Sequence, residues 1–181
     1  MKATGIVRRI DDLGRIVIPK EIRRTLRIRE SDPLEIFTDR EGEIILKKYS
    51  PIGEMTTFAK QYAESLSQVS GKTALIADRD QFIAVAGGNK GLLGKSISKE
   101  LEEKLTNRET SVSAKGEKGY ISIAKEHGEE ASQQVISPII CEGDVIGAVV
   151  LLDNDDKGKM GDVEKKLVLS AAAFLGRQME Q

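Results

Sequence analysis

The densest chemistry in this sequence is a run of cationic side chains at its start. Residues 1–29 carry nine basic and three acidic side chains, a net charge of +6, and seven of the nine are arginines. A planar guanidinium group can hold two phosphate oxygens at once. The following segments are acidic, with net charges of −3 over residues 30–53 and −4 over residues 54–181. This asymmetry indicates a polyanion-binding surface, although charge alone leaves a solvated charged face equally open.

Helical spacing predicts how part of this cluster is presented. At 100° per residue, Ile22 and Leu26 share one side of a helix. Arg23, Arg24 and Arg27 then share the other side, where they can lie along a phosphate backbone.

Three more arginines precede that helix. Arg8 and Arg9 are adjacent in an apolar run that resembles a strand, so they face opposite sides, and we expect one of them to meet the ligand directly. Arg15 follows Gly14 at a turn, from which a long side chain can reach into a groove.

The remaining residues offer little for catalysis. Cys141 and His127 are the sole cysteine and histidine, too few for an ordinary Cys/His metal site. There is no phosphate-loop motif, and no spacing of carboxylates requires catalysis. Gly87, Gly88 and Gly91 lie in a loop that a ligand could approach, but a flexible connection is favoured. We therefore expect no enzyme, no metal and no cofactor.

The first part of the chain is a small β-rich unit. Its expected elements are strands at residues 6–10, 16–18, 34–38 and 43–49 and a helix over 20–26, with Pro19 at the first helical position. About 50 residues with few large apolar side chains need a metal, disulfides or oligomerisation. With a single cysteine and no metal ligands, we expect a dimer in which both chains share one core.

The pattern changes near residue 53, so we expect two domains, at 1–53 and 54–181. Helical spacing predicts a first helix over 55–69, a helix through Leu101 and Leu105 capped by Ser98, and a last helix over about 162–179. Strands are expected at 73–78, 82–86, 133–141 and 145–153, whereas residues 107–119 give no clear pattern. The fold class is thus α+β, an antiparallel sheet with flanking helices. The apolar faces of the two terminal helices either cover their own sheet or pack against a partner's pair.

Composition limits the cellular setting. No apolar stretch approaches the roughly 20 residues that span a bilayer, and no signal peptide is evident. A lone cysteine fits a reducing compartment. We therefore expect a cytoplasmic protein that does not contact membrane.

The N-terminal sequence closely resembles the AbrB-type transition-state regulators. The resemblance is carried by TGIVRRIDDLGRIVIP at residues 4–19, EIRRTL at 21–26, LEI at 34–36 and IILKKY at 44–49. Less closely, the C-terminal part resembles a GAF-type domain. The resemblance implies a swapped-hairpin homodimer that binds double-stranded DNA mainly through Arg8, Arg15, Arg23 and Arg24, with Arg9 and Lys2 as weaker candidates. It also implies activation of some promoters and repression of others during spore development.

Residues 1–29 contain no Asn or Gln for the bidentate contact to adenine. We therefore expect a tolerant site preference that depends on DNA shape.

Several points stay open at this stage. A GAF-type domain implies either a site for an unidentified small molecule or a role in assembly, with a homotetramer if each domain pairs with a different partner. One alternative is an antitoxin, since some antitoxins share the swapped hairpin but end in a flexible tail. Another is a GAF-type redox enzyme, which normally needs a nucleophilic and a resolving thiol, whereas Cys141 is expected to be a buried structural residue.

Overall fold

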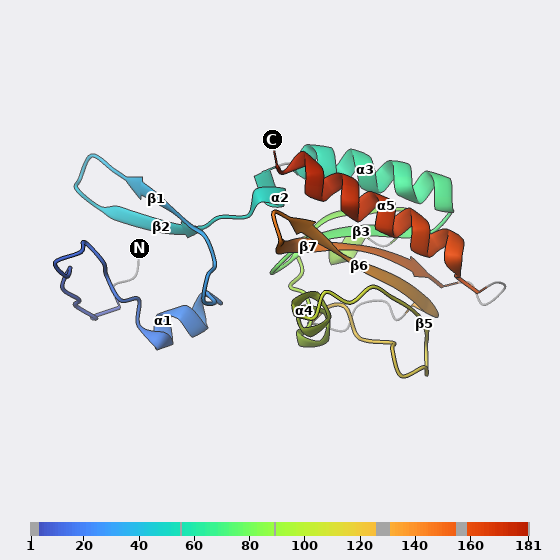
Figure 1. Ribbon diagram of the computed structural model, residues 1–181, viewed down its shortest axis with the longest axis horizontal. Coiled ribbons are helices and arrows are strands. Elements are labelled where there is room, and N and C mark those ends of the chain that lie inside the picture. Colours follow the sequence, from blue (N-terminus) through green and yellow to red (C-terminus); the bar gives the residue numbers. More distant parts are fainter. Residues whose placement is uncertain (1–3, 55, 89, 126–130, 155–158, 181) are drawn as a thin grey trace. The chain divides into compact units, whose positions relative to one another are not determined.

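The computed structural model describes residues 4–54, 56–88, 90–125, 131–154 and 159–180. The chain divides into two compact units, Met1–Tyr49 and Ser50–Gln181. The first holds one helix and one hairpin, and the second holds a helix-flanked sheet (Figure 1). No helix among the described residues is long and apolar enough to cross a membrane.

The first unit contains the expected helix and second hairpin. Helix α1 covers Lys20–Thr25 and begins directly after Pro19, which is therefore the N-cap residue and not the first helical one. The helix ends where the Ile28 N–H donates to the Arg23 carbonyl at 2.7 Å, with Arg27 in the left-handed conformation at φ 53°. Strands β1 (Leu34–Thr38) and β2 (Ile44–Lys48) form an antiparallel pair.

The expected strands at residues 6–10 and 16–18 are not formed in the single chain. The turn between them is present, because the Gly14 N–H donates to the Asp11 carbonyl and the Asp11 N–H to the Arg15 carbonyl, both at 3.0 Å. A strand exists only when its backbone groups pair with another strand. In the described part of this chain nothing supplies that pairing.

The first unit has almost no interior of its own. Of its described residues, Pro19 alone is buried. Large apolar side chains lie open instead, with Val7 85% and Val17 72% exposed. Other large apolar side chains of this unit are exposed as well: Ile6, Ile10, Leu13, Ile16, Leu26, Ile36, Phe37, Ile44 and Leu46. So much exposed apolar surface on one small unit marks a surface for association.

The second unit is built on a five-stranded antiparallel sheet. Its strands are β3 (Thr73–Asp78), β4 (Phe82–Ala86), β5 (Ser111–Ala114), β6 (Gln133–Cys141) and β7 (Asp144–Asp153). They lie in the order β4-β3-β7-β6-β5, and every neighbouring pair is antiparallel.

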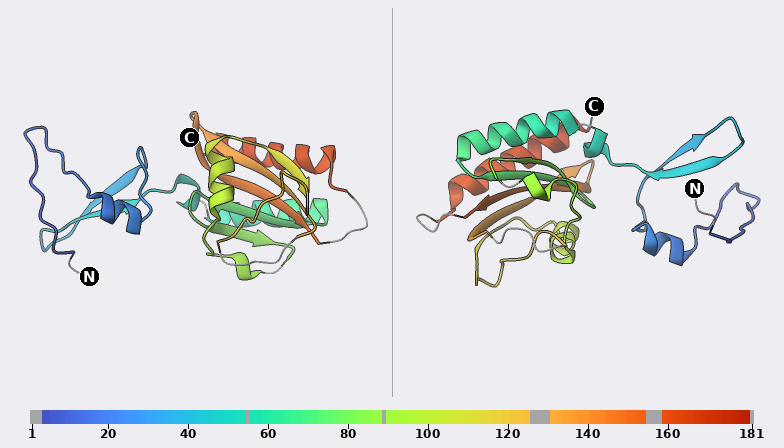
Figure 2. Two further views of the ribbon diagram at one scale, coloured as in Figure 1. Left: turned by 90° about the horizontal axis from the view of Figure 1, so that it is seen from below. Right: turned by 180° about the vertical axis from the view of Figure 1, so that it is seen from behind.

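Helices cover both faces of that sheet. Helices α3 (Thr56–Ser70) and α5 (Asp162–Gln178) lie side by side on one face, and α4 (Lys99–Thr106) lies on the other (Figures 1 and 2). The short helices α2 (Pro51–Glu54) and η1 (Lys90–Leu92) complete the unit. Two clusters of buried apolar side chains pack between the sheet and these helices, one on each face. One includes Ala63, Val149 and Val168, and the other includes Leu75, Phe82 and Leu101.

Most expected elements of this unit are confirmed, including the cap of α4, where the Leu101 N–H donates to Ser98 Oγ at 3.0 Å. Strand β5 was missed because it is four residues long and half polar. Gly87 and Gly88 have a packing role rather than forming a loose connection. A Cβ on Gly87 would lie 1.9 Å from Ser67 Oγ, and one on Gly88 would lie 2.3 Å from Thr73 Oγ1.

Candidate nucleic-acid interface

The arginines of the first extended segment are accessible. Arg8 and Arg9 are both exposed. Arg8 makes one long hydrogen bond, from Nη1 to the Val7 carbonyl at 3.4 Å, so its guanidinium has most of its donors available. Lys2, the other candidate from this end of the chain, lies outside the described residues.

Arg15 is held in place by the turn that precedes it. One Asp11 carboxylate oxygen accepts the Arg15 backbone N–H at 2.7 Å and the Leu13 N–H at 3.0 Å, and the other accepts Arg15 Nε at 2.7 Å. These bonds from Arg15, backbone first and then side chain, hold the pKa of the Asp11 carboxyl below its ordinary value. The carboxylate orients the Arg15 side chain, and the two Nη groups still face solvent because that side chain is 70% exposed.

Helix α1 presents its two arginines differently. Arg24 is exposed, whereas Arg23 is half-buried and its Nε is buried without a hydrogen-bond partner among the described residues. Leu26, expected to anchor the helix, is 57% exposed, and no residue of α1 is buried. In the single chain the apolar side of the helix therefore lacks the surface it was expected to pack on.

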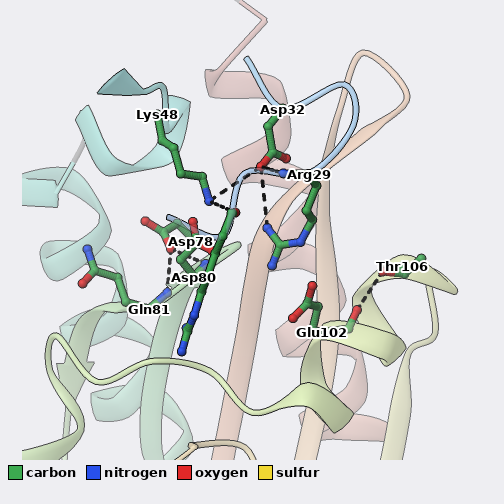
Figure 3. Close-up of polar contacts among 9 residues, drawn as sticks. Arg29, Asp32, Lys48, Asp78, Asp80, Gln81, Glu102 and Thr106 are labelled. Carbon is green, nitrogen blue, oxygen red and sulfur yellow. Dashed lines mark hydrogen bonds and ion pairs between the residues drawn. The ribbon is translucent and has the colours of Figure 1, made fainter. Parts of the chain in front are cut away.

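Two further cations of the unit, Arg29 and Lys48, are engaged in a structural cluster that spacing along the sequence did not suggest. Asp32, whose side chain is 5% exposed, accepts the Arg29 backbone N–H at 2.8 Å and lies 3.6 Å from Lys48 Nζ and 4.0 Å from Arg29 Nη1 (Figure 3). Lys48 also donates to the Arg27 carbonyl at 2.9 Å. This cluster ties the end of α1 to β2. No local signal in the sequence pointed to this contact, because it depends on the β1–β2 register, which pairs Leu34, two residues after Asp32, with Lys48.

Four predicted arginines are thus placed on two elements. Arg8 and Arg15 lie on the extended segment before α1, and Arg23 and Arg24 are consecutive on α1. The Asp32 cluster engages Arg29 and Lys48, whereas these four arginines take no part in it.

The described residues of the second unit offer no comparable site for chemistry. Cys141 is half-buried, not fully buried as expected. Burial raises the pKa of its thiol, and the carboxylates of Glu142, Glu180 and Asp144 raise it further. A protonated thiol is a poor nucleophile. No cluster of three or more metal-ligating side chains occurs in the part of the chain that the structure describes, and His127 lies outside that part.

Comparison with known proteins identifies the chain's relatives. Residues 54–180 match the family described as stage V sporulation protein T C-terminal, transcription factor. Over its whole length the chain is 54% identical to stage V sporulation protein T of Bacillus subtilis, covering 100% of both proteins. The chain belongs to the stage V sporulation protein T family.

Each half of this family member has further relatives. Residues 7–54 match the family described as antidote-toxin recognition MazE, bacterial antitoxin. The transition state regulatory protein AbrB of B. subtilis is 44% identical over 108 residues, which are 60% of this chain and 93% of AbrB. The GAF domain of an Acinetobacter phosphoenolpyruvate-protein phosphotransferase covers 69% of this chain and 81% of its own, at 12% identity and a TM-score of 0.58. The second unit therefore has the GAF fold.

Proposed function

We propose that the chain is a DNA-binding transcription regulator of spore development that activates some genes and represses others. Residues 1–53 bind double-stranded DNA through Arg8, Arg15, Arg23 and Arg24, with Arg9 and Lys2 in a secondary role. Residues 54–181 sense a small molecule or assemble the protein. The observation that carries this proposal is the arginine-rich start of the chain, where Arg8, Arg15 and Arg24 are exposed while Arg29 and Lys48 are held by Asp32.

Binding requires two chains. Residues 4–19 lack a strand partner, and the unit exposes its apolar side chains, so a second copy whose hairpin interleaves with the first supplies both a sheet and a core. Each copy of residues 1–29 carries a net charge of +6, so the dimer presents +12 on a two-fold surface.

Phosphate contacts dominate this mode of recognition. If about six to eight phosphates are neutralised per dimer, the logarithm of the binding constant should fall with the logarithm of salt concentration at a slope of about −5 to −7. Fluorescence anisotropy of the intact chain with labelled duplex DNA measures that slope. A slope near zero would contradict the proposal that these arginines bind phosphate groups of the DNA.

The second unit joins dimers into a homotetramer through α3 and α5. Three aromatic rings of these helices contact one another: Phe174 lies 5.5 Å from Tyr62 and 5.9 Å from Phe58 between ring centroids, and Phe174 is 41% exposed, whereas Phe58 and Tyr62 are half-buried. An exposed ring beside two half-buried ones leaves apolar surface on the helix pair that a partner's helix pair would cover. Light scattering should give a tetramer for the intact chain and a dimer for Phe174→Asp. A tetramer that survives this substitution would place the contact elsewhere.

An antitoxin is a second candidate, because residues 7–54 match an antitoxin family. Antitoxins of the swapped-hairpin type end in a flexible tail that wraps a toxin. Here the second unit is a packed GAF fold with two buried apolar clusters. Limited proteolysis tests the difference, since residues 54–181 should resist cleavage if they fold as a sensor and should be cleaved throughout if they are a tail.

A redox enzyme is disfavoured, and we propose that the chain is not an enzyme. The raised pKa of Cys141 keeps its thiol protonated, and the sequence has no second thiol to resolve an intermediate. Reduction of free methionine sulfoxide, assayed with the intact chain and with Cys141→Ala, should stay at background for both. Reduction of methionine sulfoxide by the intact chain that is lost with Cys141→Ala would show that the chain is an enzyme and would contradict this proposal.

A further inference from the structure

The turn before α1 sets one arginine apart from the others that are proposed to bind DNA. Arg15 forms an ion pair with Asp11. Among the described residues, Arg8, Arg23 and Arg24 have no carboxylate partner. A carboxylate beside a phosphate-binding cation weakens that binding, because its charge repels the phosphate. The ion pair therefore indicates a different task for Arg15.

Three hydrogen bonds join Arg15 to Asp11. The Arg15 N–H donates to Asp11 Oδ1 at 2.7 Å, and the Arg15 carbonyl accepts the Asp11 N–H at 3.0 Å. Arg15 Nε donates to the second carboxylate oxygen, Asp11 Oδ2, at 2.7 Å. Gly14, with φ at 76°, allows the chain to turn back between the two residues. The backbone and the guanidinium of Arg15 are thus both held by one turn that forms within a single chain.

The bond at Nε leaves the far edge of the Arg15 guanidinium open. Nη1 and Nη2 have no hydrogen-bond partner among the described residues, and the side chain is mostly exposed. These two groups present parallel N–H donors in one plane. Guanine presents two acceptors side by side in the major groove of B-DNA, O6 and N7, and an arginine can bond both at once. The open edge of Arg15 therefore has the shape that guanine recognition requires.

A guanidinium that is already held suits base recognition better than a mobile one. A free arginine loses rotational freedom when it binds a base edge, whereas Arg15 has lost part of that freedom in the folded turn. The negative charge of Asp11 also reduces the attraction of Arg15 to phosphate groups, which is the attraction that does not depend on sequence. Both effects favour directional contact to a base over contact to the backbone.

From this geometry we propose that Asp11 is a positioning residue that makes Arg15 the guanine-reading side chain of the DNA-binding surface. Each chain of the dimer then contacts one guanine through Nη1 and Nη2, and the two-fold axis relates the two guanines. Arg8, Arg23 and Arg24 contact phosphates. This inference rests on the proposed function, because it requires residues 1–53 to bind duplex DNA.

The test begins with duplexes that have a random central segment, selected for binding to the intact chain. The bound duplexes should share guanine at two positions related by symmetry. Replacing these guanines by 7-deazaguanine removes the N7 acceptor alone. Binding of the unsubstituted chain should weaken about tenfold, because each of two arginines loses one hydrogen bond. Arg15→Ala keeps the backbone bonds of the turn, and its binding should change by less than about twofold when the base is modified.

Asp11→Asn separates the positioning of Arg15 from the folding of the turn. The amide oxygen can still accept the Leu13 and Arg15 N–H groups, but the partner of Arg15 Nε loses its charge. The effect of 7-deazaguanine should fall below about threefold. On a duplex of unrelated sequence, the slope of log K against log salt should steepen by up to about 1.8, because one more cation per chain is free to bind phosphate.

The matched control is Asp12→Asn. It makes the same change of charge at an exposed neighbour that has no contact with Arg15 among the described residues, so it should keep the full effect of 7-deazaguanine. The proposal is overturned if Asp11→Asn or Arg15→Ala also keeps the full effect. It is overturned alone if the unsubstituted chain binds duplexes but ignores the modified base. A chain that binds no duplex overturns the proposed function together with this inference.

Discussion

Replacing Arg24 by alanine should weaken duplex binding without disturbing the fold. Arg24 is exposed on α1 and forms no ion pair among the described residues, so its loss leaves no buried charge behind and stability should change by less than about 0.5 kcal/mol. The dimer loses two phosphate contacts of about 1 kcal/mol each. Together these amount to about 2 kcal/mol, or roughly thirtyfold in the dissociation constant.

The salt dependence of DNA binding is a second measurement that Arg24→Ala should alter. Each phosphate contact contributes about −0.9 to the slope of log K against log salt, so Arg24→Ala should flatten the slope by about 1.8. Fluorescence anisotropy over a salt series measures both values. The matched control is Arg40→Ala, another exposed arginine of the first unit that lies in its acidic stretch and should change neither. An unaltered slope in Arg24→Ala would refute the assignment of this residue.

Two further substitutions and one pH titration test what stabilises the two units. Asp32→Ala should lower the free energy of unfolding of the first unit by about 2 kcal/mol, because a nearly buried carboxylate with charged partners is lost; denaturant titration measures this. The lowered pKa of Asp11 means that its ionised form stabilises the turn at pH above about 3.8 and that this support disappears as the pH falls through the lowered value; the Arg15 amide resonance reports it, and a shift completed above pH 3.8 would contradict it. Gly176→Ala should destabilise the second unit by about 1–2 kcal/mol in thermal unfolding despite alanine's higher helix propensity, since its Cβ would lie 2.1 Å from the Ile140 carbonyl oxygen.

Local signals in the sequence were sufficient to predict most elements. Helical spacing predicted α3 and α5, and the hydroxyl of Ser98 predicted the start of α4. These features depend on residues close together in the chain, so their patterns are visible without a fold.

Contacts between distant residues were not predictable in the same way. The bond of Lys48 to Asp32 depends on the register of a hairpin, and the close approach of Gly176 to Ile140 depends on how a helix lies on the sheet. The strands at residues 6–10 and 16–18 were wrong for the single chain because strand formation needs a partner. Their β-branched apolar residues, which are exposed in the single chain, agree with pairing across two chains.

The central claim is that two entwined copies of the first unit form one DNA-binding surface. The direct measurement is made on residues 1–53 alone, by light scattering and by gel retardation of duplex DNA at low salt. The account predicts a stable dimer that retards the duplex and releases it as salt is raised. A folded monomer, or a dimer that leaves the duplex free at low salt, would contradict it.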